Sequence, residues 1–426
     1  MKLTKWLLLS TEIALPLYIV RCGSFDFCQR FSPLPFTLLE VMIASTVASW
    51  TVWKYQEIKS GGDNLEKLLQ RLRTPILLPI LIFLLAGLVN SFVAADVRGG
   101  LGIFKAYFLE GFLLYIVAFD FLTQTKQIRF FLSGFLISGL WLSGLGILEW
   151  VLRWNPFAPQ ELFLRDSVSG IYSTKNALGL FLAPVLILSV SWLSWEFLGG
   201  KKEIVWWLKV GVLVLLLGIL VSGSRGAFLG LALSAAFVVA WLFFDKFKKT
   251  RLFAKLLGAS FVVLLLGQIL FFLNLDSFVP KDSVNNTAQS RICLWDGTKK
   301  LIAARPIFGS GLNGFMEVYP EYRTCGEEDL QYPHNIFLNF WVEVGLVGMV
   351  SFLTICSLQV RGLLKSNKNS LPLQVGLIAV FVAVLGHGLV DVPFFKNDLA
   401  AQFWLVLALG SYLLVKDSQL EGKSRQ

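Results

Sequence analysis

The sequence predicts an all-α protein that crosses a membrane many times. Of its 426 residues, 55% are hydrophobic and only 15% are charged, a balance unlike that of a water-soluble chain of this length. Apolar runs of about 20 residues, enough for a helix to cross a bilayer, recur along the chain. Because backbone polar groups in lipid need internal hydrogen bonds, we expect these runs to be helices.

Twelve such spans are predicted, within one membrane domain that covers residues 1–426. The first resembles a signal peptide, since Lys2 and Lys5 precede its apolar run, but no small-residue cleavage site stands before Arg21. We therefore expect it to be retained as a span. The twelve spans lie near 5–20, 33–53, 75–92, 103–122, 130–151, 171–195, 204–221, 226–244, 254–274, 334–359, 371–390 and 397–415.

The distribution of Lys and Arg predicts the orientation of these spans. When the N-terminus is placed inside, every inner segment is basic, from Lys54–Arg73 to Lys416–Arg425. This is the positive-inside pattern, and it puts both termini in the cytoplasm. The net charge of +10 is explained by these loops, so no nucleic-acid partner is implied.

One long outer loop, residues 275–333, is the only sizeable structure expected outside the bilayer. Its stretch "SRICLWDGTKKLIAARPIFGSGLNGF" alternates apolar residues such as Leu294 and Leu301 with polar ones. We expect a helix that lies along the outer membrane surface and ends at Pro306, with Lys299, Lys300 and Arg305 facing lipid headgroups.

Four of the five cysteines fall on the outer side. Cys22 and Cys28 share one outer loop, and Cys293 and Cys325 share the long one. Two local disulfides, or chance placement without a bridge, are both compatible with this pattern.

His334 is one of only two histidines, and the topology puts it outside, where the tenth span begins. In the structural interpretation it is an interfacial polar residue, and Asn335 caps the helix that follows. In the functional interpretation it is a proton acceptor at the membrane surface, and Asn335 contacts substrate. Its neighbours in the predicted topology favour the second interpretation.

The motif "VSGSRGAFLGL" places Arg225 at the outer membrane boundary, between spans with almost no loop between them. An arginine at bilayer depth costs about 2.5–3.5 kcal/mol, so it needs water or an anionic partner. Small residues, including Ser224, bring backbone N–H groups near the guanidinium and predict an anion-binding site. A snorkelling side chain or a structural ion pair is the alternative.

Arg291 begins the expected surface helix, where a guanidinium can reach a phosphate held at the membrane. Taken alone, it could equally be an ordinary loop cation.

Two further pairs of polar residues could contact a substrate. His387 and Asp391 are four residues apart in the eleventh span, so they are predicted to share a helix face, as a catalytic pair or as a mutually satisfied structural pair. Lys175 and Asn176 begin the sixth span and could meet sugar or phosphate, unless this is simply a helix start capped by Ser173 or Thr174.

The sequence has no nucleotide-binding loop, no dinucleotide fingerprint and no set of residues at metal-ligand spacing. We therefore expect neither a metal nor another cofactor.

Three motifs together resemble the bacterial O-antigen ligase and polymerase superfamily. They are "SGSRGAFLGL", "SRICLWDGTKKLIAARPIFGSGLNGF" and "PHNIFLNFWVEVGLVGMVSFL", in that order, and the resemblance extends over about residues 170–400. It implies a metal-independent, inverting glycosyltransferase of the bacterial inner membrane, GT-C-like in architecture and active on the periplasmic face. The donor would be a glycan on undecaprenyl diphosphate, and the acceptor would be lipid A–core or another glycan.

The family's two arginines match Arg225 and Arg291, and its histidine matches His334. The residues agree with these roles, because guanidinium groups can stabilise a departing diphosphate and an imidazole can accept a proton near neutral pH.

Other functions stay open at this point. The same donor chemistry serves O-antigen polymerases and protein O-oligosaccharyltransferases. A secondary transporter or lipid flippase would also suit twelve spans, although no internal repeat or pair of broken helices is evident.

Overall fold

The computed structural model describes residues 1–19, 37–153, 155, 168–246, 287–325, 330–365 and 371–424, and in them the chain forms helices and no strands. The expected span 254–274 and the pair Cys22 and Cys28 lie outside these residues. The elements are α1 (Lys2–Ile13), η1 (Leu15–Ile19), α3 (Leu38–Lys59), α4 (Leu65–Leu72), α5 (Leu77–Val93), α6 (Val97–Ile103), η3 (Phe104–Leu109), α7 (Glu110–Thr125), α8 (Ile128–Leu152), α9 (Lys175–Leu198), α10 (Lys202–Ser222), α11 (Arg225–Lys246), α13 (Thr287–Ala304), α14 (Phe315–Val318), η6 (Tyr319–Tyr322), α15 (Ile336–Lys365), α16 (Leu371–His387) and α17 (Asn397–Ser424).

Seven of the helices in this described part are long and apolar enough to cross a membrane, and α5 and α16 are shorter apolar helices. The protein is therefore a multi-pass membrane protein, while the predicted total of twelve spans stays a prediction. The first expected span is interrupted: α1 ends at Ile13, and a short 3₁₀ segment that contains Pro16 continues to Ile19.

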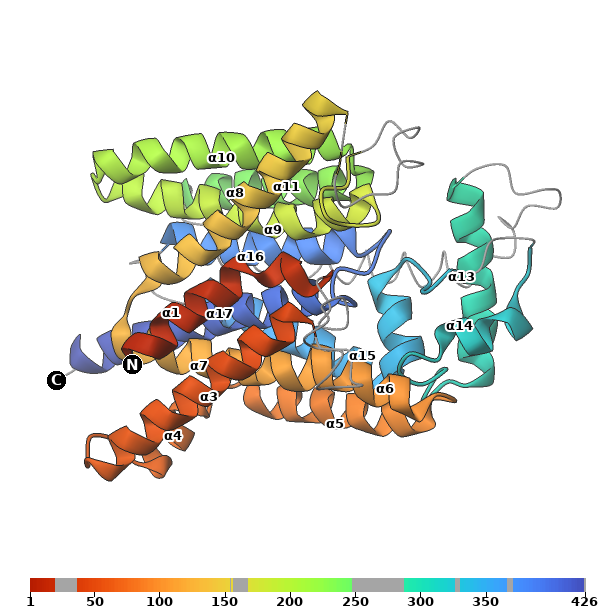
Figure 1. The fold of residues 1–426 in the computed structure, drawn as a ribbon, viewed down its shortest axis with the longest axis horizontal. Coiled ribbons are helices and arrows are strands. Elements are labelled where there is room, and N and C mark those ends of the chain that lie inside the picture. Colours follow the sequence, from red (N-terminus) through yellow and green to blue (C-terminus); the bar gives the residue numbers. More distant parts are fainter. Residues whose placement is uncertain are drawn as a thin grey trace, which may run out of the picture.

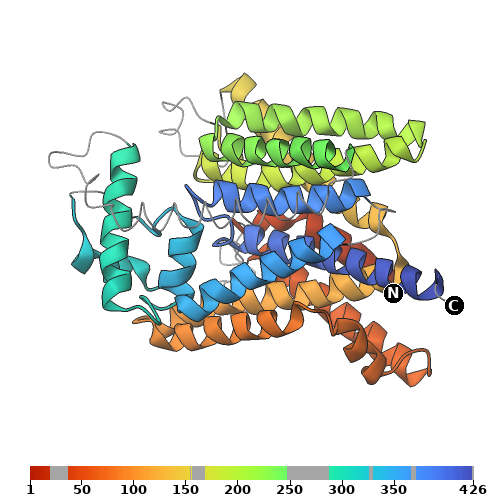
Figure 2. The same ribbon diagram turned by 180° about the vertical axis from the view of Figure 1, so that it is seen from behind.

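The long helices form a bundle in three layers (Figures 1 and 2). Helices α10 and α11 lie on one side, α5 and α6 on the other, and α16 and α17 run between them, while α8 crosses the bundle obliquely. Small residues allow α11 to pack closely on α16: a Cβ at Gly230 would lie 2.8 Å from the Ala383 carbonyl oxygen, and the Ser234 hydroxyl donates to the Ala379 carbonyl at 2.7 Å. This small-residue seam, typical of membrane helices, fixes the start of α11 beside the end of α16.

Helix α13 crosses the direction of the bundle helices at one end, and both termini lie at the other end (Figure 1). As predicted, the helix ends just before Pro306. Its apolar face, however, is covered by protein and not by membrane, because Leu294, Leu301 and Ile302 are buried with Phe315 and Val342. The predicted disulfide between Cys293 and Cys325 is formed, with a sulfur–sulfur distance of 2.00 Å.

A break in α15 holds the segment that follows α13. Gly345 has a φ of 76°, which suits glycine, and a Cβ there would lie 2.6 Å from the Ile307 carbonyl oxygen. Backbone groups freed by the break bond to this segment: Ser310 N–H donates to the Val342 carbonyl at 2.7 Å. The buried Glu343 carboxylate accepts from the Asn313 and Phe315 amides. Helix α13 is thus fastened to the helix that begins just after His334.

The opposite end of the bundle carries a buried network of charges. Lys54 lies 2.9 Å from the Asp120 carboxylate, and Arg71 pairs with Asp63. The indole N–H of Trp50 also donates to Asp120, at 2.9 Å. Predicted cytoplasmic cations are therefore partly used to join α3, α4 and α7.

Candidate active site

His334 stands at a strained backbone position. Its φ is 46°, in the left-handed region that most residues avoid. Asn335 caps α15, because its side-chain oxygen accepts from the amides of Phe337 and Leu338 at 3.0 and 3.2 Å. Cap and strained residue together turn the chain sharply as it enters α15.

The loop after α16 holds this turn in place. Ile336 N–H donates to the Gly388 carbonyl at 2.7 Å, and the Asn335 amide donates to the Leu389 carbonyl at 3.2 Å. His334 Nδ1 lies 3.3 Å from Asp391 Oδ1. Both polar ends of the Asn335 side chain are thus used by the protein itself, and its contact with substrate stays a prediction.

The charge of Asp391 determines which nitrogen of His334 carries the proton. Burial alone would raise the pKa of the Asp391 carboxyl, but its bond to His334, the nearby His387 and the Val392 amide together bring that pKa below its ordinary value. The carboxylate is therefore ionised at neutral pH and can only accept hydrogen bonds. His334 Nδ1–H then donates to Asp391, which leaves a lone pair on Nε2. The side chain is 25% exposed, so a proton acceptor is presented outward.

The expected pairing of His387 with Asp391 on one helix face is wrong. Helix α16 ends at His387, so Asp391 lies in the following loop, where it turns to His334 instead. The two groups still interact electrostatically. The prediction extended the helical period of this segment beyond His387, where α16 ends.

His387 instead connects this loop to Arg225. A Cβ on Gly226 would lie only 2.3 Å from His387 Nε2, so the buried imidazole packs directly against the backbone next to Arg225. Arg225 is the first residue of α11 and its side chain is exposed. The end of α16 thus lies between Arg225 on one side and the Asp391 loop on the other.

The predicted polar groups around Arg225 are also brought together. The Ser224 hydroxyl donates to the Asn176 side-chain oxygen at 3.3 Å and accepts from the Ala227 amide at 3.4 Å. Ser224 therefore caps α11 and fixes the start of α9 beside it. Thr174 caps α9 by accepting from the Ala177 amide at 3.3 Å, while Lys175 is exposed.

Arg291 reaches the same region through α13. Trp295 is one turn further on the same face of α13, and its indole N–H donates to the Pro333 carbonyl at 2.8 Å. The positive charge of Arg291 also acts on His387. Each of the three residues is thus linked to the segment from His387 to Asp391: His334 by its contact with Asp391, Arg225 through its neighbour Gly226, and Arg291 by its charge. The tethering role of Trp295 was not predicted.

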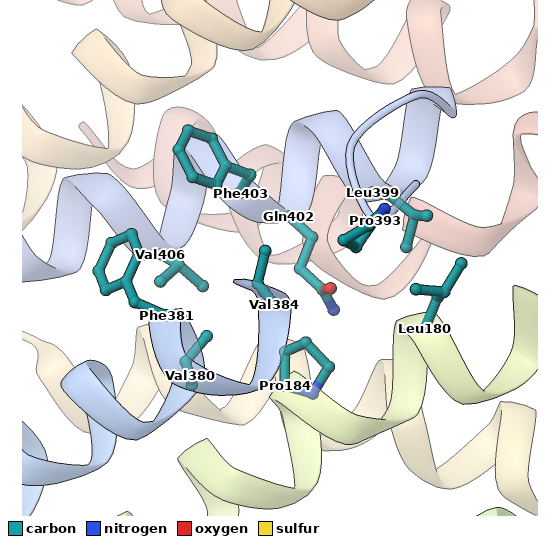
Figure 3. A pocket seen from close by; sticks show the side chains of 10 residues that line it. All are labelled: Leu180, Pro184, Val380, Phe381, Val384, Pro393, Leu399, Gln402, Phe403 and Val406. Atoms are coloured by element: carbon teal, nitrogen blue, oxygen red, sulfur yellow. The ribbon is translucent and has the colours of Figure 1, made fainter. Parts of the chain in front are cut away.

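An apolar pocket lies between α9, α16 and α17, beside the Asp391 loop (Figure 3). Pro184, Val380 and Phe403 are among its lining residues. Its polar group, Gln402, donates its side-chain amide to the Phe181 carbonyl at 3.2 Å. The other side chains that line the pocket are apolar, so the pocket does not suit a charged phosphate.

Residues 210–353 match a protein-family model described as O-antigen ligase. This match supports the resemblance of the chain to the O-antigen ligase and polymerase superfamily. The matched segment contains Arg225, Arg291 and His334, and it ends before His387 and Asp391. No match to this chain is found among curated proteins. The match to this family model supports a glycan-transferring activity in O-antigen assembly, with lipid-linked glycan and acceptor substrates in general.

Proposed function

We propose that the protein transfers a glycan from undecaprenyl diphosphate to a hydroxyl group of lipid A–core, as an O-antigen ligase. The observation that carries this proposal is the His334–Asp391 pair, 3.3 Å apart, at the end of the bundle where Arg225 and Arg291 approach. In this membrane-boundary position a base and two guanidinium groups can act on a lipid-held donor.

In the proposed reaction, His334 Nε2 accepts the proton of the acceptor hydroxyl as its oxygen attacks the anomeric carbon. The bond from that carbon to the diphosphate oxygen breaks, and undecaprenyl diphosphate leaves with the bonding electron pair. Attack opposite the leaving group inverts the configuration. Asp391 orients the imidazole and balances its charge once it is protonated.

Arg225 and Arg291 are proposed to hold the diphosphate and to stabilise the negative charge that grows as it leaves. Arginine suits this task because its planar fork can contact two phosphate oxygens at once. The donor is already activated, so this transfer needs no nucleotide hydrolysis.

We place the site on the periplasmic face of the inner membrane and both termini in the cytoplasm. Two observations support this placement: the termini lie at the end of the bundle away from α13 (Figure 2), and the cations Lys54 and Arg71 gather at that far end, consistent with the positive-inside pattern.

The test is reconstitution of the purified protein with a defined lipid-linked glycan and a core acceptor, without ATP or an ion gradient. Release of undecaprenyl diphosphate with glycan on the acceptor is expected. His334→Asn is the informative variant, because Asn tolerates the left-handed backbone while removing the base. Arg305→Ala is a matched control for Arg291→Ala, since Arg305 is exposed just beyond the end of α13.

A strain lacking the protein separates ligase from polymerase. Loss of a ligase leaves bare lipid A–core, whereas loss of a polymerase leaves core bearing one repeat unit. Movement of lipid-linked glycan across vesicles, without any transfer in the reconstituted assay, would instead indicate a flippase.

A further inference from the structure

Beside the His334–Asp391 pair, four tyrosines and a lysine form what we call the tyrosine cluster: Tyr18, Tyr107, Tyr172, Tyr332 and Lys396. They come from η1, η3 and three loop segments that are far apart in sequence. The ring centroids of Tyr18 and Tyr172 are 6.2 Å apart, and Lys396 Nζ lies 5.8 Å from the centroid of Tyr172. The Tyr172 hydroxyl donates to buried Asp398 at 2.6 Å, which fixes this ring.

The cluster is continuous with the candidate active site. The rings of Tyr332 and His334 are 5.8 Å apart, and the Tyr332 hydroxyl lies within electrostatic range of Asp391. Tyr107 packs against Phe395 with ring centroids 6.5 Å apart, in the loop that also carries Asp391 and Lys396. Tyr18 interacts electrostatically with Tyr107 and Tyr332, and Tyr107 with Tyr332, which places the three side chains in the same region.

The polar atoms of these groups lack hydrogen-bond partners within the described part of the chain. Neither the hydroxyls of Tyr18, Tyr107 and Tyr332 nor the Lys396 ammonium makes a hydrogen bond there. All four side chains are nevertheless only partly exposed. Burial also lowers the pKa of Lys396, although Asp398 and Asp391 partly oppose this. Polar groups that gather unpaired in a protected place are normally matched by a ligand.

The position of the cluster indicates which ligand it would meet. Arg225 is the first residue of α11, whereas Tyr107 lies in η3, which directly follows α6. Helices α11 and α6 lie on opposite sides of α16 and α17 (Figure 1). A base must touch the acceptor hydroxyl, so we assign the groups around His334 on the side away from Arg225 to the acceptor. Aromatic faces together with hydroxyl and ammonium donors suit a sugar ring.

We propose that the tyrosine cluster is the acceptor subsite, in which Tyr18, Tyr107, Tyr332 and Lys396 hold a hydroxyl-rich sugar ring against His334. This inference rests on the proposed transfer reaction, because it names the acceptor as the occupant. A sugar of the donor glycan would draw on the same chemistry, and the experiment distinguishes the two.

The experiment measures the KM values for acceptor and donor separately, with delipidated core oligosaccharide as the acceptor probe. Tyr18→Phe, Tyr107→Phe and Tyr332→Phe each remove one oxygen, and each should raise the acceptor KM about two- to tenfold, while Lys396→Met should raise it at least about tenfold. The donor KM should stay within twofold. Tyr55→Phe, an exposed tyrosine on α3, is the matched control.

An acceptor KM that is unchanged in all four variants would overturn the subsite, and so would a rise confined to the donor KM. Binding of the same oligosaccharide to His334→Asn, measured by calorimetry, separates this result from failure of the proposed function. If wild-type protein transfers no glycan, binding that weakens in Lys396→Met and in the tyrosine variants still supports the subsite. Binding that is absent, or insensitive to these changes, refutes it.

Discussion

Asp391→Asn tests the proposed orientation of the base, because it removes one negative charge with almost no change in shape. The carboxylate accepts from His334 Nδ1 at 3.3 Å and from the Val392 amide at 2.9 Å. Asn keeps an oxygen for the Val392 amide, so the loop should stay folded. Both contacts are made to the same oxygen, Oδ1, so what His334 loses is the negative charge of its partner. A hydrogen bond to a charged group contributes about 1.5–3 kcal/mol.

The 3.3 Å distance is long for such a bond, so the lower end of that range, about 1.5–2 kcal/mol, applies. This energy corresponds to a fall in kcat of about 10- to 30-fold. An Asn amide can also donate to Nδ1, which would move the ring proton to Nε2 and remove the base altogether. The estimate is therefore a minimum.

The assay is the reconstituted transfer reaction, followed as kcat and KM for each substrate. The donor KM should hardly change, because Asp391 acts on the base and not on the diphosphate in the proposed reaction. Glu317→Gln, an exposed carboxyl on α14, is the control. Wild-type kcat in an Asp391→Asn variant that melts normally would refute the orienting role of Asp391.

Three further predictions concern the scaffold. Gly226→Ala should place a Cβ against the His387 ring and destabilise the protein by about 1–3 kcal/mol, seen as a lower Tm in detergent. Gly102→Ala is the control and should leave the Tm unchanged, because a Cβ there has nothing within 4 Å. An equal Tm for the two variants would contradict the packing of His387 against Gly226. Replacing Cys293 and Cys325 by Ser opens a loop with a sequence separation of 32 and should cost about 3–4 kcal/mol, and a reducing agent should lower the Tm of the wild type alone. The hydrogen bond from Arg71 lowers the pKa of Asp63 to about 2, so the stabilisation from Asp63 is present above the ordinary pKa of 3.8 and is lost as the pH falls through about 2. Asp63→Asn should therefore lower the free energy of unfolding by about 2 kcal/mol at pH 7. If the Tm of this variant fell with acid as steeply as that of the wild type, the assignment would be contradicted.

Much of the fold could be predicted, because membrane helices depend on local sequence properties. Apolar length and the distribution of Lys and Arg located the helical stretches that fall in the described residues, and Pro306 marked the end of α13. The break in α15 was not predicted. Gly345 lies within a largely apolar run, and only the docking of the segment around Ile307, from outside the helix, shows why glycine is needed there.

The candidate site was predictable as a set of residues but not as a set of contacts. Arg225, Arg291 and His334 were conspicuous because charged or titratable groups at a membrane boundary are costly. Their connections depend on tertiary structure: His387 touches Gly226, and Trp295 bonds to Pro333. The pairing of Asp391 was missed for a physical reason, since a sequence period does not reveal where a helix unwinds.

The strained backbone of His334 connects these observations. A left-handed residue other than glycine costs about 1–2 kcal/mol, and the chain keeps one here at the entrance to a membrane helix. Three bonds from two separate elements offset this cost. Trp295 of α13 donates to the Pro333 carbonyl, and in the loop after α16 the Gly388 carbonyl accepts from Ile336 and the Leu389 carbonyl accepts from Asn335. An extended or helical residue 334 would point its side chain elsewhere, away from the alignment with Asp391. A strained residue that several surrounding bonds hold in place is expected where the direction of its side chain matters more than local stability. On this reasoning, His334→Gly should preserve or raise the Tm while abolishing transfer, and a variant that both loses stability and keeps activity would show that the turn serves the fold alone.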